Sequence, residues 1–347
     1  MAAATFNLVN PLSEENAKRK VIEPDQTDYS PGEEEISRAT LIWRAIKLPM
    51  YTVALIPLSV GTAAAYLETG QYSMERYFIN LGSFVLVNVW VNLSNDVYDF
   101  DTGADVNKKE SVVNLVGSRT AVHVLAWVLL ALGFIGLVWV AHEARSPRSI
   151  LLLACAIFSG YIYQCPPFRL SYSGVGEPLC FAAFGPFSTI AFYLLQSRTS
   201  ELPITCIVVW TSILVGFTSS LILFCSHFHQ INDDKAVGKI SPLVRLGTET
   251  GSKVVKMAVL GLYWLVFGLG LVETLPYACL IFCIMTLPVA NSVVSFVQEN
   301  HKDKTKIFMA KYYCVRLHTI FGVALAAGMV VARMYATKQL PQALSNF

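Results

Sequence analysis

Two acidic clusters follow apolar stretches of the chain, and their spacing suggests metal chemistry. In the segment NLSNDVYDFDTGAD, Asp96 and Asp99 stand four residues after Asn92 and Asn95. Residues four apart share one face of a helix. The apolar helix that precedes this segment is therefore predicted to carry a polar stripe that becomes acidic at its end. Polar residues inside a membrane helix usually face the bundle interior or a water-filled cavity.

The second cluster repeats this arrangement in the segment CSHFHQINDDKAVGK. Ser226, Gln230 and Asp234 follow one another at four-residue steps, and Asp233 lies beside them. This spacing predicts one polar stripe on one helix. Two such stripes that open on the same side of a membrane can form a single pocket.

Clustered carboxylates repel one another unless a cation lies between them. Mg²⁺ is the natural candidate, because it prefers oxygen ligands and is commonly held by one or two carboxylates together with substrate phosphates. Basic side chains in the same loops could contact the remaining phosphate oxygens. An apolar pocket that continues into the bundle would suit a hydrocarbon tail. These features predict a lipid diphosphate as ligand. The basic and tyrosyl candidates for binding it are Lys108, Lys109, Tyr163, Arg169, Tyr172, Lys239 and Arg245.

A simpler interpretation exists for each acid alone, since an Asp at a helix end is often only a solvated loop charge. It does not explain why two stripes end alike on one side while the other side has no comparable cluster. A non-catalytic scaffold and a transporter that couples transport to acidic groups remain as alternative functions. Transporters place such groups near the bilayer midplane, often in repeated halves, whereas these acids lie at helix ends.

The composition indicates that the elements carrying these residues are membrane helices. Of the 347 residues, 54% are hydrophobic and 14% are charged, against about 25% charged in soluble domains. Because only helices and closed barrels satisfy the backbone in lipid, and the apolar runs lack strand alternation, we expect an all-α polytopic bundle of about nine transmembrane helices. The nine apolar stretches are 48–67, 77–95, 121–141, 150–168, 178–197, 202–230, 257–272, 274–298 and 317–332.

The distribution of basic residues supports this topology. If the nine stretches span in turn, 20 of the 26 Lys and Arg residues lie on the side of the acidic clusters and six on the other. The positive-inside rule then places the acidic loops in the cytoplasm or an equivalent compartment such as a chloroplast stroma. We expect a disordered acidic tail over 1–42, the transmembrane domain over 43–337 and a C-terminal tail over 338–347. Membrane lipid should surround the helices, and no nucleic-acid partner is expected.

The acidic motifs together resemble those of UbiA-type intramembrane aromatic prenyltransferases. Asn95, Asp99, Gly103 and Asp105 match the first motif in the form that it takes in the branch acting on 1,4-dihydroxy-2-naphthoate. The second motif is matched by Asp234, Gly238 and Lys239. A third recurring stretch is matched by 174–178 and 184–186, and the resemblance covers about residues 40 to 335. Any one of these motifs alone would be weak evidence for the family, whereas the combination is specific.

The resemblance implies a fold, a reaction and roles for the site residues. It implies a nine-helix prenyltransferase that uses Mg²⁺ to transfer a prenyl group from its diphosphate, phytyl diphosphate being the expected donor. The expected acceptor is 1,4-dihydroxy-2-naphthoate, which loses CO₂, as in phylloquinone synthesis in a chloroplast membrane with the acidic loops in the stroma. The catalytic candidates are Asn95, Asp99, Asp105 and Asp234. The metal candidates are Asp96, Asp99, Asp105, Gln230, Asp233 and Asp234.

One position departs from the family pattern. The second motif normally begins with Asp four residues before Asp234, but this chain has Gln230 there. An amide can ligate Mg²⁺ or orient a bound water, but it adds no charge, which makes Asp233 a possible substitute. A homogentisate or hydroxybenzoate prenyltransferase of the same family remains an alternative, because pocket shape determines the acceptor.

Overall fold

The computed structural model describes residues 48–104, 108, 111–196 and 202–344. Every regular element in these ranges is helical, and none of them is a strand. The predicted acidic tail over 1–42 lies outside the described residues, as do Asp105 and Lys109.

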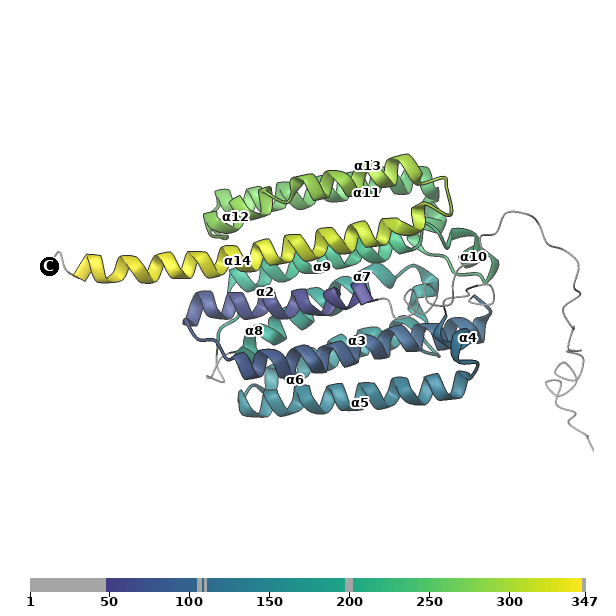
Figure 1. The fold of residues 1–347 in the computed structure, drawn as a ribbon, viewed down its shortest axis with the longest axis horizontal. Helices are drawn as coiled ribbons and strands as arrows, with labels where there is room; N and C mark the ends of the chain where they lie inside the picture. Colours follow the sequence, from purple (N-terminus) through teal and green to yellow (C-terminus); the bar gives the residue numbers. More distant parts are fainter. Residues whose placement is uncertain (1–47, 105–107, 109–110, 197–201, 345–347) are drawn as a thin grey trace, which may run out of the picture. The chain divides into compact units, whose positions relative to one another are not determined.

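Long helices run side by side through the bundle, as Figure 1 shows, and short helices lie between their ends. The long elements are α2 (Thr52–Thr69), α3 (Met74–Thr102), α5 (Arg119–Glu143), α6 (Pro147–Gln164), α9 (Cys206–Ser226), α11 (Pro242–Leu271), α13 (Leu287–Asn300) and α14 (Ala310–Leu344). The short ones are η2 (Leu48–Tyr51), α4 (Val112–Val116), η3 (Leu170–Ser173), α7 (Gly176–Ala182), the π-helical η4 (Ala183–Thr189), α8 (Ile190–Gln196), α10 (Ile231–Ala236), α12 (Tyr277–Ile284) and η5 (Ile307–Met309).

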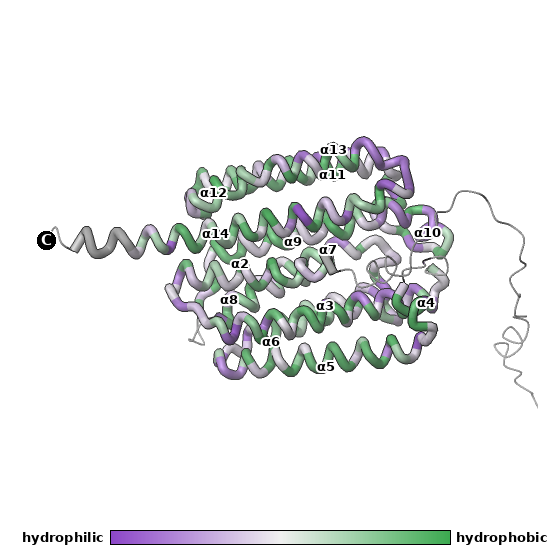
Figure 2. Tube along the Cα trace, viewed as in Figure 1, coloured by the Kyte–Doolittle hydropathy of each residue, from purple (hydrophilic) through white to green (hydrophobic). Residues whose placement is uncertain are grey.

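The helices confirm a multi-pass membrane protein. Within the described residues, seven helical segments are long and apolar enough to cross a membrane, with α7, η4 and α8 forming one of them. The pair α12 and α13, bent by 42°, makes an eighth if it is one span. Figure 2 shows apolar residues along these helices and polar ones near their ends. The expected count of about nine is therefore approximate; α6, with polar residues at both ends, packs in the same bundle.

Close contacts between the helices depend on small residues. This is common in membranes, because lipid is as apolar as the helix surfaces and the hydrophobic effect does not drive helices together. A side chain at Gly216 of α9 would lie 2.7 Å from the backbone oxygen of Phe181 in α7. A side chain at Gly61 of α2 would overlap the backbone oxygen of Thr189. These contacts bring α2, α7, η4 and α9 together around the centre of the bundle.

The second acidic stripe is not on one continuous helix, which corrects the expectation from its spacing. Helix α9 ends at Ser226, and α10 begins at Ile231. Between them the amide of His227 bonds to the oxygen of Phe224 at 3.2 Å, and the amide of Gln230 bonds to the oxygen of His227 at 3.1 Å. These bonds span three residues rather than four, so they tighten the turn and redirect the chain.

The short helices α4 and α10 lie at the same end of the bundle, on the right in Figure 1. We call this the acidic end, because α3 and α9 deliver the two clusters to it. The end at which the chain turns from α2 into α3 is called the opposite end.

Candidate active site

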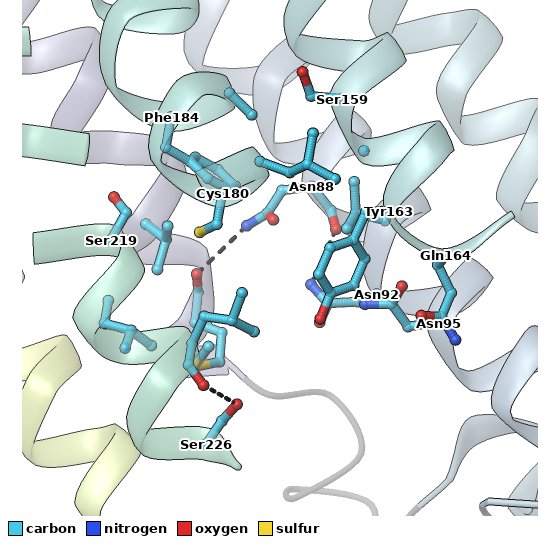
Figure 3. A pocket seen from close by; sticks show the side chains of 18 of the residues that line it. Asn88, Asn92, Asn95, Ser159, Tyr163, Gln164, Cys180, Phe184, Ser219 and Ser226 are labelled. Atoms are coloured by element: carbon cyan, nitrogen blue, oxygen red, sulfur yellow. Dashed lines mark hydrogen bonds between the residues drawn. The ribbon is translucent and has the colours of Figure 1, made fainter. Parts of the chain in front are cut away.

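A cavity of about 240 Å³ extends from the acidic end into the bundle. Its polar mouth includes side chains from α3, α6 and the α9–α10 turn, and Phe84, Leu137 and Leu153 line its apolar part. Figure 3 shows Asn88, Asn92 and Asn95 along this cavity, and other polar groups around them. The polar stripe predicted for α3 therefore faces a cavity, as intramembrane polar groups usually do.

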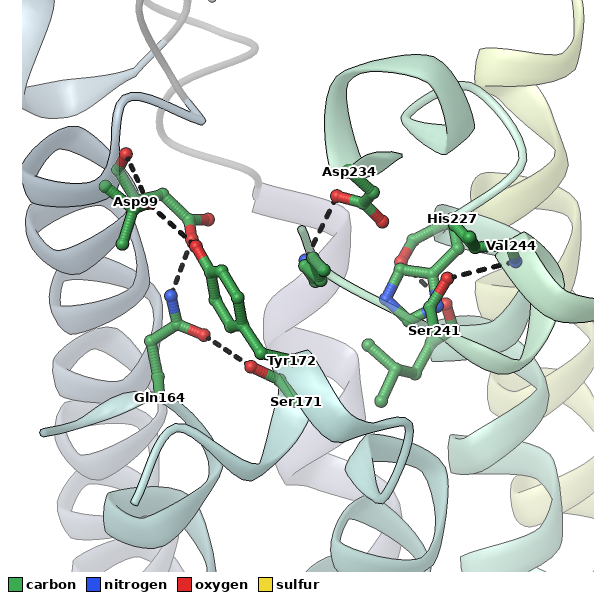
Figure 4. Close-up of polar contacts among 12 residues, drawn as sticks. Asp99, Gln164, Ser171, Tyr172, His227, Asp234, Ser241 and Val244 are labelled. Atoms are coloured by element: carbon green, nitrogen blue, oxygen red, sulfur yellow. Dashed lines mark hydrogen bonds and ion pairs between the residues drawn. The ribbon is translucent and has the colours of Figure 1, made fainter. Parts of the chain in front are cut away.

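Asp99 lies at the mouth within a chain of hydrogen bonds. Its Oδ1 accepts a bond from Nε2 of Gln164 at 2.6 Å, and Oε1 of Gln164 accepts one from the Ser171 hydroxyl at 3.0 Å. The hydroxyls of Thr102 and Tyr172 are 2.7 Å apart beside it. Figure 4 shows this network facing Asp234. The Asp99 carboxylate is thus oriented by the neutral amide of Gln164, and no basic side chain among the described residues forms an ion pair with it.

Asp96 is engaged differently from Asp99, although both end the same helix. Its carboxylate is 1% exposed; Oδ1 lies 3.4 Å from Nζ of Lys108, and Oδ2 accepts a 2.9 Å bond from the amide of Val112. The carboxylate thereby holds the start of α4 against the end of α3. Asp96 and Lys108 both line the cavity, so Asp96 holds Lys108 at the mouth.

Asp234 provides a second carboxylate, which faces Asp99 and is paired with Lys239 of the cavity wall (Figure 4). One oxygen lies 3.3 Å from Nζ of Lys239, and the other is buried with no hydrogen-bond partner among the described residues. Burial raises the pKa of Asp234, and repulsion by Asp99 adds to the rise, while Lys239 opposes it. Burial, Asp99 and Asp234 also raise the pKa of Tyr172 to about 12. The two acids therefore act on each other across the mouth, which a cation between them would relieve.

Some predicted binding residues lie at the cavity and others beside it. Tyr163 and Gln230 line it. Lys239 lies 5.8 Å from the centre of the Tyr172 ring. Arg169 has its Nε buried with no hydrogen-bond partner in the described part of the chain. Arg245 is exposed and donates a 2.9 Å bond to the backbone oxygen of Ser173. It therefore holds the segment between α6 and α7 that carries Tyr172.

Asp233 is far more exposed than its neighbour Asp234. Its carboxylate is about half exposed and lies 3.1 Å from Nζ of Lys304. Neither Asp233 nor Asp234 is among the residues that line the cavity, but Asp234 is buried against Lys239, which does line it.

Several residues at the site escaped sequence reasoning. Phe308, Lys311 and Tyr312, which follow the last basic loop, line the same cavity as the acids. Nζ of Lys311 lies 3.9 Å from the centre of the Phe308 ring. No spacing rule relates these residues to the acidic motifs more than 70 positions earlier, so only the fold reveals them. Glu177 and His227 form a further pair, 3.1 Å apart.

The donors present fit a magnesium ion. Asn95 Oδ1 and one oxygen of Asp234 are buried acceptors without a hydrogen-bond partner in the described ranges, and Asp99 stands opposite Asp234. Mg²⁺ typically takes one or two carboxylates and completes its octahedron with water and substrate phosphate. The described residues contain no group of three His, Cys, Asp or Glu side chains placed to hold a metal. A site completed by phosphate needs no such group.

This membrane bundle, with two opposed acidic groups at the mouth of an apolar cavity, has the organisation of an intramembrane prenyltransferase. The UbiA prenyltransferase family matches residues 54–315, and the chain belongs to that family. The resemblance seen in the acidic motifs is thereby confirmed.

Two named relatives match most of the chain. It is 63% identical to the chloroplastic 2-carboxy-1,4-naphthoquinone phytyltransferase of Arabidopsis thaliana, over 87% of this chain and 80% of that protein. It is 42% identical to the 2-carboxy-1,4-naphthoquinone phytyltransferase of Synechocystis, over 87% of this chain and 97% of that protein. A UbiA homolog from Archaeoglobus fulgidus bound to GPP and Mg²⁺ shares the fold, with a TM-score of 0.51 and 14% identity over 83% of this chain and 99% of that one.

Proposed function

We propose that the chain transfers a phytyl group from phytyl diphosphate to 1,4-dihydroxy-2-naphthoate, with loss of the acceptor carboxylate as CO₂. The observation that carries this proposal is the cavity lined by Asp99 and Lys239, with Asp234 facing Asp99, in a chain 63% identical to a naphthoquinone phytyltransferase. The acceptor in that relative's name is a quinone. Its two-electron-reduced form is 1,4-dihydroxy-2-naphthoate, whose electron-rich ring can attack an allylic cation.

The residues at the mouth would bind and orient the diphosphate. Asn95, Asp99 and Asp234 supply oxygens for Mg²⁺, which when bound would neutralise the leaving diphosphate. Lys239 and Lys108 stand beside Asp234 and Asp96 at 3.3 and 3.4 Å, so each could turn its charge toward a phosphate oxygen. Positive groups fixed before the reaction stabilise charge that develops as the C–O bond breaks.

The apolar part of the cavity would take the hydrocarbon tail and exclude water. Phe84, Leu137 and Leu153 offer no hydrogen bond to a water molecule. Water must be kept from an allylic cation if the acceptor is to capture it. Tyr163 lines the cavity and could stabilise the cation through its ring.

The location follows from the same comparison and from the charge distribution. The Arabidopsis relative is named as chloroplastic. We therefore propose a chloroplast membrane, with the acidic end in the stroma, because that end carries most of the Lys and Arg residues.

The proposal can be tested with membranes that contain the full chain. Phytyl, geranylgeranyl and solanesyl diphosphates are each combined with 1,4-dihydroxy-2-naphthoate, homogentisate and hydroxybenzoate, with Mg²⁺ or with a chelator. We expect phytylated, decarboxylated naphthoquinol as the main product by mass spectrometry, and none with chelator. A product only from homogentisate or hydroxybenzoate, or undiminished turnover in chelator, would overturn the proposal.

A further inference from the structure

A carboxylate and an imidazole meet at the wall of the cavity. Glu177 lies in the first turn of α7, and His227 follows the last residue of α9. Oε1 of Glu177 is 3.1 Å from Nδ1 of His227, and the two side chains are 13% and 4% exposed. His227 lines the same cavity as Asp99 and Lys239. Neither residue is needed to explain diphosphate binding.

The contact fixes which nitrogen of His227 can act as a base. An ionised carboxylate only accepts hydrogen bonds, so the hydrogen of a neutral imidazole must be on Nδ1. Nε2 then carries the free lone pair, which makes it the nitrogen that can take a proton. A carboxylate on Nδ1 also stabilises the imidazolium that forms.

The carboxylate of Glu177 is not required to attach α7 to α9. The backbone oxygen of Glu177 already accepts a 3.0 Å bond from the hydroxyl of Ser220 in α9. The second carboxylate oxygen, Oε2, is buried and has no hydrogen-bond partner among the described residues. A buried acceptor without a partner destabilises a folded protein. Such an arrangement favours a catalytic role over a purely structural one.

We propose, building on the proposed function, that His227 takes the proton of the acceptor hydroxyl next to the carboxylated carbon, with Glu177 as its positioning residue. As the ring π electrons form the new bond from that carbon to the allylic carbon, the O–H electron pair becomes the second bond of a ketone, and Nε2 receives the proton. The product is a β-keto carboxylate. Its C–CO₂ bond then breaks and that electron pair becomes the ring C=C bond, while the π pair of the ketone moves to its oxygen, to which His227 returns the proton.

The chemistry of this cycle needs a weak base that is not consumed. A phenol whose ring has been alkylated at the neighbouring carbon is a protonated ketone, which is a strong acid, so a neutral imidazole accepts its proton readily. Because the same proton returns after CO₂ leaves, the cycle requires no oxidant and no net proton from solvent. General acid–base groups of this kind contribute about 10²- to 10⁴-fold to the rate.

The test uses full-length protein in membranes. His227→Gln retains a side chain that can hydrogen-bond Glu177 but has no basic nitrogen. We expect its kcat to fall about 10²- to 10⁴-fold, with the KM for phytyl diphosphate changed by less than about threefold. Pyrophosphate release should exceed product formation, since bond cleavage continues while slower capture by the acceptor lets water take the phytyl cation as the alcohol. His227→Ala should regain activity when imidazole is added, and Glu177→Gln should lower kcat less than His227→Gln.

The matched control is His301→Gln. His301 bonds to Thr248 at 3.2 Å and does not line the cavity, so wild-type kinetics are expected. A His227→Gln kcat within about threefold of wild type, or a loss in His227→Ala that imidazole does not reverse, would overturn the role of His227. If wild-type membranes make no phytylated naphthoquinol, the proposed function itself fails, which separates the two conclusions.

Discussion

Two carboxylates at the two ends of the bundle differ in how they are satisfied. At the opposite end, Glu68 in the last turn of α2 accepts a bond from the Tyr193 hydroxyl at 2.9 Å through one oxygen and from the Thr205 hydroxyl through the other. At the acidic end, Asp234 has one oxygen on Lys239 and the other without a partner in the described residues. One carboxylate is saturated by the fold, and one keeps capacity for a ligand.

This difference separates a structural role from a binding role. Glu68 connects α2 to α8 and to the segment that enters α9. At the same end, the side chains of Arg333 and Arg148 also connect segments, by donating bonds of 3.2 and 3.1 Å to the backbone oxygens of Leu67 and Leu202. A protein interior normally pairs its buried polar groups. A buried carboxylate left half-paired beside an apolar cavity is therefore the more informative of the two for function.

The largest expected effect comes from removing the acids at the mouth. Asp99→Ala and Asp234→Ala should each lower phytyl transfer by about 10³-fold or more, because each removes an oxygen and a charge from the Mg²⁺–diphosphate site. Product formation at saturating Mg²⁺ measures this. Because Asp234 also pairs with Lys239, a melting curve is needed to show that the variants are folded. Turnover near the wild-type rate in both variants would remove the metal assignment.

Sequence reasoning could anticipate this site because helix spacing carries the information. Four-residue steps place Asn95 and Asp99 on one face of α3, and that face does line the cavity. The same rule failed for Ser226, Gln230 and Asp234, since a tight turn breaks the helix after Ser226. Spacing rules hold only while the helix continues, and the sequence does not mark this break with Pro or Gly.

The second effect tests the saturated carboxylate. Glu68→Ala leaves the Thr205 hydroxyl without its carboxylate partner and removes one acceptor of the Tyr193 hydroxyl. We expect a loss of about 1–3 kcal/mol in stability and a melting temperature several degrees lower, with kcat within about twofold of wild type. Thermal unfolding in detergent and a turnover assay below the transition measure both. A large fall in kcat with an unchanged melting temperature would contradict the structural role.

Residues that reach the site from distant parts of the chain could not be predicted from pattern. Phe308, Lys311 and Tyr312 come from η5 and α14, and the contact of Glu177 with His227 joins α7 to the end of α9. Helix packing creates these neighbours, and helix packing in a membrane follows small residues such as Gly216 rather than the polar motif. A single sequence shows the motif but not which faces meet.

A smaller effect is expected at the position that departs from the family pattern. Gln230→Asp adds a carboxylate beside the mouth, and Gln230 lines the cavity. The added charge should lower the Mg²⁺ concentration for half-maximal rate several-fold, with a modest change in the maximal rate. Titration of activity with Mg²⁺ measures this, with Gln230→Asn as the uncharged control. An unchanged Mg²⁺ dependence would mean that residue 230 does not ligate the ion.

The smallest effect is expected at Asp233, which is adjacent to Asp234 in sequence but unlike it in setting. Its carboxylate is 48% exposed and pairs with Lys304, which is 60% exposed. Exposed ion pairs contribute about 0–1 kcal/mol, so Asp233→Asn should leave the melting temperature and the rate nearly unchanged. Parallel assays of Asp233→Asn and Asp234→Asn give the sharpest contrast, because the same chemical change is made at neighbouring positions. If Asp233→Asn also abolished turnover or weakened Mg²⁺ dependence, partnered and open carboxylates would not differ in function. Asp233 would then have to turn from Lys304 to the metal when substrate binds.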